Sequence, residues 1–184
     1  NTGDSSATIV NFKAGYDSLN LYVEFFVIDS TLEINNTKHD SPIFKNDDCV
    51  EIFIDFDGDG KNYLELGVNP NGVYYDCIII CPAIKCGSWK SDLNFDLDTV
   101  LITSNKTKYT NKLKNLAYSV QITIPFKSLE AFKKYGFKQP EEGTIWKANF
   151  FNINPTNDSH SAWSPSKSFG FHQPIYFGEL IFEK

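Results

Sequence analysis

The sequence contains no arginine and no methionine. All 17 basic residues are therefore lysines, and the guanidinium fork that grips carboxylates and phosphates in a bidentate manner is unavailable. The formal net charge is -6 at pH 7, which argues against a nucleic-acid partner because phosphate backbones require a basic surface. Without an initiating methionine, we expect the chain to be a processed form or a piece of a longer protein.

Long apolar runs are also missing, so the sequence predicts no membrane span. Cysteine occurs at four positions, Cys49, Cys77, Cys81 and Cys86, and these allow three pairings. Cys81 and Cys86 bracket the short stretch CPAIKC, which a disulfide could close, whereas Cys49 and Cys77 fall in strand-like runs typical of small core residues. No C-x2-C pair with a histidine partner is present, which disfavours a zinc site.

Aromatic residues, in contrast, make up 15% of the chain and favour pleated, half-buried surfaces. Short alternating runs separated by turn signals predict strands at residues 21–29, 49–56, 62–69, 72–81, 99–104, 116–125, 144–153 and 176–184. A short helix is expected over residues 126–136, with Gly136 as its stop signal. The predicted fold is all-β, an antiparallel β-sandwich of about ten strands with a short helix, in a single domain over residues 1–184.

Residues 47–72, DDCVEIFIDFDGDGKNYLELGVNPNG, predict two strands paired as a hairpin. Because side chains alternate between the faces of a strand, Glu51, Glu65, Gly67 and Asn69 are expected on one mixed face. Gly67 would leave a gap through which a ligand could approach the backbone. Such a face suits a sugar, although an ordinary solvated sheet face is the open alternative.

The loop between these strands, DFDGDG, resembles the start of an EF-hand. The bidentate Glu that an EF-hand needs would fall at position 66, which is Leu66, and the flanks are strand-like, so an EF-hand is rejected. A looser calcium site at Asp55, Asp57 and Asp59 stays open beside the alternative of an acidic hairpin turn.

The sequence contains little that indicates a catalytic site. Glu51 and Glu65 could be cross-strand neighbours and serve glycoside hydrolysis, but nothing nearby distinguishes an acid from a nucleophile. No nucleophile elbow, zinc-protease, P-loop or dinucleotide motif stands in a fitting context. His39, His160 and His172 are scattered along the chain. We therefore expect no enzymatic activity.

An ordered series of blocks resembles carbohydrate-binding module family 9 and its DOMON-like relatives. The blocks are LYVEFFVID, HDSPIFKNDDCVEIFIDFDGDGKNYLELGVNPNGVYYD, AYSVQITIPFKSL, GTIWKANFFNI, AWSP and FHQPIYFGELIF. They cover most of the chain from about residue 21 to the end. The resemblance implies a non-catalytic β-sandwich attached to, or acting beside, a secreted polysaccharide hydrolase such as a xylanase. It also implies a mono- or oligosaccharide ligand, structural calcium, and an extracellular or cell-surface location.

In this family two tryptophans grip a sugar between them, and the resemblance places Phe44 and Phe171 at those positions. Glu51 matches a family glutamate in the VEIF block. The family arginine and asparagine of the next strand fall at Gly67 and Asn69, so the arginine is missing. Phenylalanine stacks with a smaller face than tryptophan.

Gln121, Trp163 and His172 complete the predicted ligand-binding set. Gln121 belongs to the polar face of residues 116–125, and Trp163 lies in a loop rich in Ser, Asn and Pro, where binding rings often sit but where a ring also plugs the end of a sandwich. Trp89 is a further ring candidate, and the strand context of Trp146 favours the core.

Two other functions stay open beside carbohydrate binding. The replaced aromatic and arginine positions favour a structural or interaction module with a vestigial site. Some DOMON-like relatives bind haem for redox chemistry; those with a Met/His ligand pair are excluded here because the chain has no methionine, and we expect no haem.

Overall fold

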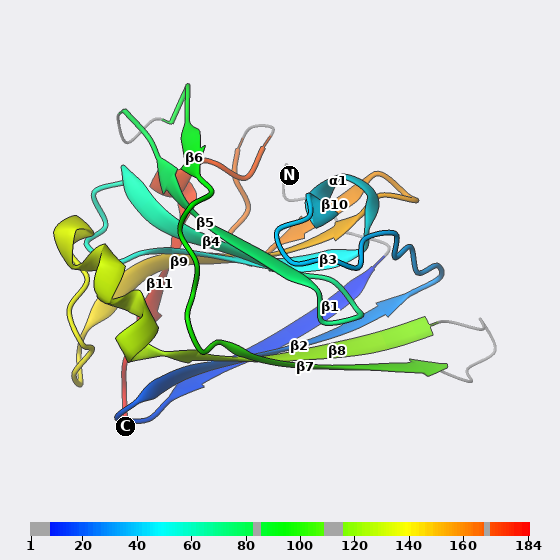
Figure 1. Cartoon of the computed structure of the whole chain (residues 1–184), viewed down its shortest axis with the longest axis horizontal. Coiled ribbons are helices and arrows are strands. Elements are labelled where there is room, and N and C mark those ends of the chain that lie inside the picture. The colour runs from blue at the N-terminus through cyan, green and yellow to red at the C-terminus, as the bar shows by residue number, and fades with distance from the viewer. Residues whose placement is uncertain (1–7, 83–85, 109–115, 168–169) are drawn as a thin grey trace.

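A computed structural model describes residues 8–82, 86–108, 116–167 and 170–184. Two antiparallel sheets pack face to face (Figure 1). The four-stranded sheet has the order β1 (Ile9–Tyr16), β2 (Asn20–Asp29), β8 (Leu116–Pro125) and β7 (Leu101–Lys108). The seven-stranded sheet has the order β10 (Ser159–Ala162), β9 (Ile145–Asn154), β3 (Cys49–Asp55), β4 (Asn62–Val68), β5 (Tyr74–Ile80) and β6 (Lys90–Asp92), with β11 (Gly178–Ile181) also on β9. The predicted all-β sandwich is confirmed.

The main core fills the space between the two sheets. Alternate residues of each strand point inward, as the period of two predicts, and those of β3 are Val50, Ile52 and Ile54. Trp146 on β9 is 1% exposed in this core, as predicted from its strand context. Burial of these branched and aromatic side chains supplies the main driving force for the sandwich.

The outer face of the seven-stranded sheet is also covered. All seven residues of β3 are buried, and a second cluster around Phe53, Tyr63 and Phe177 lies on the side away from the main core. Phe171 and Phe177 supply part of this cover. The mixed face of the predicted hairpin is therefore mostly buried, which corrects the alternative of an ordinary solvated sheet face.

In the part of the chain that the structure describes, three short helical segments connect the strands. They are α1 (Ile43–Asn46) and the 3-10 helices η1 (Phe126–Tyr135) and η2 (Pro174–Tyr176). Gly136 ends η1 in the left-handed conformation, with φ 84°, as its predicted role of stop signal requires. Within the described ranges, no helix combines the length and the apolar content that crossing a membrane takes.

The cysteines follow the sequence pattern. Cys81 and Cys86 form a disulfide that closes the short loop after β5. Cys49 and Cys77 are free thiols buried on β3 and β5.

Candidate functional site

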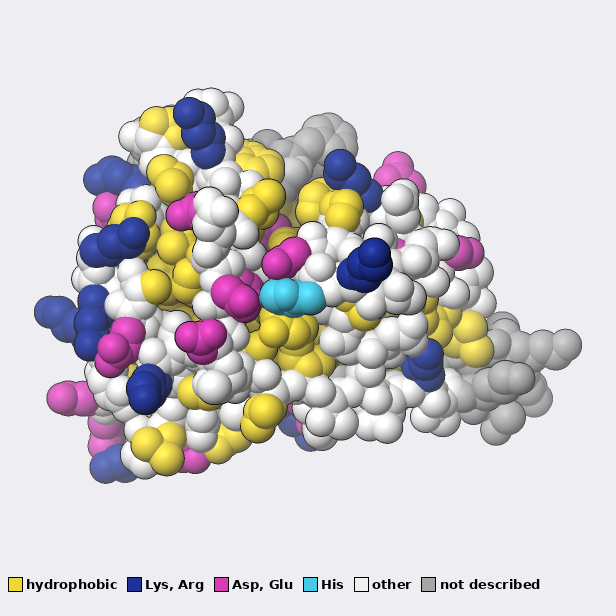
Figure 2. Space-filling view, viewed as in Figure 1, with side chains coloured by type: hydrophobic (Ala, Val, Ile, Leu, Met, Phe, Trp, Pro, Cys, Tyr) yellow, Lys and Arg dark blue, Asp and Glu magenta, His cyan; other side chains and the backbone are white. Residues whose placement is uncertain are grey.

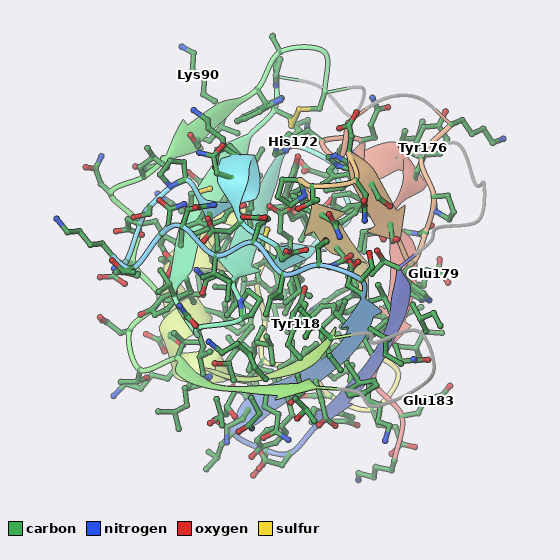
Figure 3. The ribbon with its side chains drawn as sticks, turned by 90° about the vertical axis from the view of Figure 1, so that its right-hand side faces the viewer. Lys90, Tyr118, His172, Tyr176, Glu179 and Glu183 are labelled. Carbon is green, nitrogen blue, oxygen red and sulfur yellow. A yellow bond between two sulfur atoms is a disulfide. The ribbon has the colours of Figure 1, made fainter. Side chains whose placement is uncertain are left out.

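A cleft of about 1190 Å³ opens over the outer face of β3, β4 and β5. Its walls come from α1, from the segment that leads into β6, from β10, and from residues 170–172. Figure 2 shows acidic, hydrophobic and histidine side chains gathered near the middle of one face of the molecule. In Figure 3, His172 lies beyond the seven-stranded sheet, whereas Tyr118 lies between the two sheets. The cleft is thus separate from the main core.

Three neighbouring strands place Glu51, Glu65 and Tyr75 on the floor of this cleft. The Tyr75 hydroxyl lies 2.6 Å from Oε1 of Glu51 and 2.6 Å from Oε1 of Glu65. A phenol carries one proton, so it donates to one carboxylate and the other contact needs a proton from the carboxyl group. The geometry therefore favours one shared proton on this carboxyl pair, and we name the three residues the floor triad.

The pKa values of the triad agree with that proton count. Burial raises the pKa of Glu51 to about 8, and repulsion from Glu65 adds to the rise while the Tyr75 hydrogen bond opposes it. Burial likewise raises the pKa of Glu65 to about 7. Near neutral pH the pair consequently carries less negative charge than two exposed carboxylates.

Gly67 on β4 makes room for the Tyr75 ring. It pairs directly with Tyr75, and a Cβ atom at Gly67 would lie 2.2 Å from Cε1 of that ring. The gap predicted at Gly67 is therefore filled by a cross-strand aromatic ring, so a ligand does not meet the backbone there. Sequence reasoning missed Tyr75, although the NPNG turn sets the register that places it opposite Gly67.

Phe44 and Phe171, the predicted stacking rings, both line the cleft together with Glu51. Phe44 on α1 is 40% exposed, and its ring meets the Tyr75 ring edge to face at 5.5 Å. Phe171 is half-buried and stacks on Phe151 of β9, with ring centroids 4.0 Å apart. Both rings are held by packing on rigid strands, and both keep surface toward the cleft.

His172 and Trp89 form another part of the cleft wall. The His172 ring stacks on Phe53 with ring centroids 5.2 Å apart, and its centroid lies 3.8 Å from that of Trp89 in a tilted contact. The Tyr63 hydroxyl lies 2.9 Å from Nδ1 of His172. Burial lowers the pKa of His172 to about 4, so the imidazole is neutral at pH 7.

Three predicted binding residues lie outside the cleft, which corrects their assignment to one site. Asn69 is fully buried: its amide donates to Asp47 at 2.8 Å, and its carbonyl accepts from the backbone of the NPNG turn. Asn69 therefore holds the segment before β3 in place, and its side-chain amide is fully used in hydrogen bonds within the protein. Strand periodicity predicted the face of the sheet on which Asn69 lies, but it could not predict that a loop covers this face.

Gln121 and Trp163 depart from the prediction for other reasons. Gln121 lies on β8 in the four-stranded sheet, where its amide donates to Glu24 at 3.0 Å. Trp163 packs edge-on against Phe12 and Phe150, and a Cβ atom at Gly178 would lie 2.5 Å from its ring. Trp163 thus plugs one end of the sandwich, the alternative that its loop position left open.

The Asp55, Asp57 and Asp59 side chains gather in the turn between β3 and β4, each with an oxygen within 4.8 Å of the others. Asp55 accepts hydrogen bonds from the backbone of Gly58 at 3.1 Å and Gly60 at 2.8 Å, as in an acidic turn. Burial, with a contribution from Asp57, raises the pKa of Asp55 to about 6. Crowded carboxylate oxygens are the donors that Ca²⁺ prefers, so the residues present fit that ion.

The two-sheet sandwich with an aromatic-walled, acid-floored cleft is the architecture of a carbohydrate-binding module. The model of carbohydrate-binding family 9 matches residues 4–182, and the chain belongs to that family. Members are non-catalytic binding modules.

Solved structures share the fold. A candidate carbohydrate-binding protein of Bacteroides uniformis superimposes with a TM-score of 0.72 at 17% identity, over 96% of this chain and 79% of its own. A family 9 module of Caldicellulosiruptor kristjanssonii in complex with cellotriose gives 0.60 at 20% identity, over 98% and 78%. Its glucose complex gives 0.61 at 21% identity, over 98% and 80%. No curated protein matches the chain.

Proposed function

We propose that the cleft binds a mono- or oligosaccharide without cleaving it. The observation that carries this proposal is the convergence of Phe44, Phe171 and the carboxyl group of Glu51 on one open cleft. Aromatic rings pack against the C–H faces of a pyranose, and carboxyl and phenol oxygens accept or donate hydrogen bonds to its hydroxyls. The glucose and cellotriose complexes of the Caldicellulosiruptor module support a glucose-type ligand.

The context that we propose is a secreted polysaccharide-degrading system. A module of this kind holds an appended or associated glycoside hydrolase, for example a xylanase, close to its substrate. Its place would be extracellular or at the cell surface. The Cys81–Cys86 disulfide supports this location, because such bonds persist in oxidising compartments.

Isothermal titration against glucose, xylose, cellotriose and xylotriose tests the binding proposal. We expect micromolar to millimolar affinity, because few contacts must offset the ordering of ligand and side chains. Phe44→Ala and Phe171→Ala should each weaken binding about tenfold through lost stacking surface. Phe26→Ala is the matched control, since Phe26 is 37% exposed on the other sheet. Silence of the unaltered protein across the panel would favour a vestigial, structural module.

We also propose a structural calcium ion at Asp55, Asp57 and Asp59. Burial, with a contribution from Asp57, raises the pKa of Asp55, and a divalent cation would favour its charged form. Calcium should raise the melting temperature, and Asp57→Asn with Asp59→Asn should remove the effect. An unchanged melting temperature at millimolar calcium would leave the cluster as an acidic turn.

A further inference from the structure

We propose that Trp89, His172 and Glu65 form a second sugar subsite, which takes the next unit of an uncharged oligosaccharide chain. This inference rests on the proposed function, with the first unit between Phe44 and Phe171 above Glu51. The cleft is large enough for two units, since about 1190 Å³ exceeds the roughly 300–1,000 Å³ of ordinary small-ligand pockets.

The aromatic wall of the second subsite is built into the fold. The His172 ring stacks on Phe53 and makes a close tilted contact with Trp89, and Phe53 belongs to the fully buried strand β3. The Cys81–Cys86 disulfide anchors the chain before Trp89, and the pairing of β6 with β5 anchors it directly afterwards. The indole is nevertheless 45% exposed. A large ring that is held in place but left open is a stacking surface for a sugar.

A polar pair lies beside this wall. Nε2 of His172 and Oε2 of Glu65 are 3.8 Å apart, which is too long for a direct hydrogen bond. The Tyr63 hydroxyl can donate to Nδ1 of His172, and in that tautomer the neutral ring carries its proton on Nε2. A sugar hydroxyl beside both atoms can accept from Nε2–H and donate to Glu65. The pair thus offers one donor and one acceptor at the spacing that a bridging hydroxyl requires.

The charges around the cleft determine the class of sugar. Acidic residues line it from several elements: Asp40, Asp158, and the partly protonated Glu51, Glu65 and Asp76. Among the described lining residues, Lys45 is the lone lysine. A uronic acid or a sulfated sugar would be repelled, so the chain that fits is uncharged.

Calorimetry of Trp89→Ala tests the subsite. Affinity for cellotriose, or for xylotriose if that is the trisaccharide bound, should fall about tenfold, while affinity for the corresponding monosaccharide changes less than about twofold. A galacturonic acid trisaccharide should not bind. The control Phe26→Ala should bind both sugars as the unaltered protein does.

Equal losses for the monosaccharide and trisaccharide, or no loss for either, would overturn the subsite while leaving carbohydrate binding intact. A second measurement does not depend on the alanine variant. The indole N–H resonance of Trp89, assigned with Trp89→Phe, should shift with the trisaccharide and not with the monosaccharide. Failure of the unaltered protein to bind any sugar contradicts the proposed function itself.

Discussion

The absence of a side chain at Gly67 determines which groups form the floor of the cleft. Gly67 on β4 leaves a space that is taken by the ring of Tyr75 from the next strand. The floor triad therefore presents a hydroxyl that is shared by two carboxyl groups.

Gly67→Ala should destabilise the protein by about 1–3 kcal/mol, because the new methyl group overlaps the Tyr75 ring and forces a shift in a packed layer. Urea denaturation measures the change. Gly15→Ala is the matched control, since Gly15 is also in a strand but has nothing within 4 Å of its added Cβ. Equal effects of the two substitutions would show that the contact with Tyr75 does not matter.

Tyr75→Phe should cost about 1–3 kcal/mol of folding free energy at pH 8.5, because it leaves two buried carboxyl groups without their shared hydroxyl. At pH 5 the loss should be smaller, since protonated carboxyl groups repel less and can bond to each other. Denaturation at both pH values provides the comparison. A loss independent of pH contradicts the shared proton.

The strands and loops differ in how far the sequence predicts them. The hairpin of β3 and β4, with Glu51 and Glu65 on one face, follows from local alternation. The cover over that face does not, because it comes from residues more than a hundred positions later, including Phe171 and His172. Gln121 shows the same limit: its face was predictable, but its membership of the other sheet depends on long-range pairing.

The disulfide between Cys81 and Cys86 closes the loop that follows β5. Cys81→Ser with Cys86→Ser should lower stability by about 2 kcal/mol, as the entropy of closing so short a loop predicts. If the second subsite exists, the double variant should also weaken trisaccharide binding, since Trp89 loses one anchor. Denaturation and calorimetry measure the two effects. Unchanged stability would mean that β5–β6 pairing alone holds the segment.

Across the whole molecule, buried carboxyl groups make stability depend on pH. Burial raises the pKa of Asp48 and Asp76 to about 7, alongside Glu51 at about 8 and Glu65 at about 7. The folded state therefore holds more protons than the unfolded chain above about pH 4.5, and stability falls as pH rises through these values. The lowered pKa of His172 makes stability rise with pH, but only between about pH 4 and 6.5.

The melting temperature should therefore be higher at pH 6.5 than at pH 8.5, where the histidine no longer contributes. Glu51→Gln with Glu65→Gln should flatten this dependence, because amides do not titrate. Thermal unfolding across the range measures both curves. A melting temperature that rises from pH 6.5 to 8.5 would contradict the raised carboxyl pKa values.

The most direct test of carbohydrate binding is a crystal structure of the protein soaked with the tightest-binding sugar of the titration panel. The account predicts a pyranose ring between Phe44 and Phe171, with hydroxyl groups bonded to Glu51. Density for the sugar elsewhere, for instance beside Gln121 on the four-stranded sheet, with the cleft empty, would contradict it.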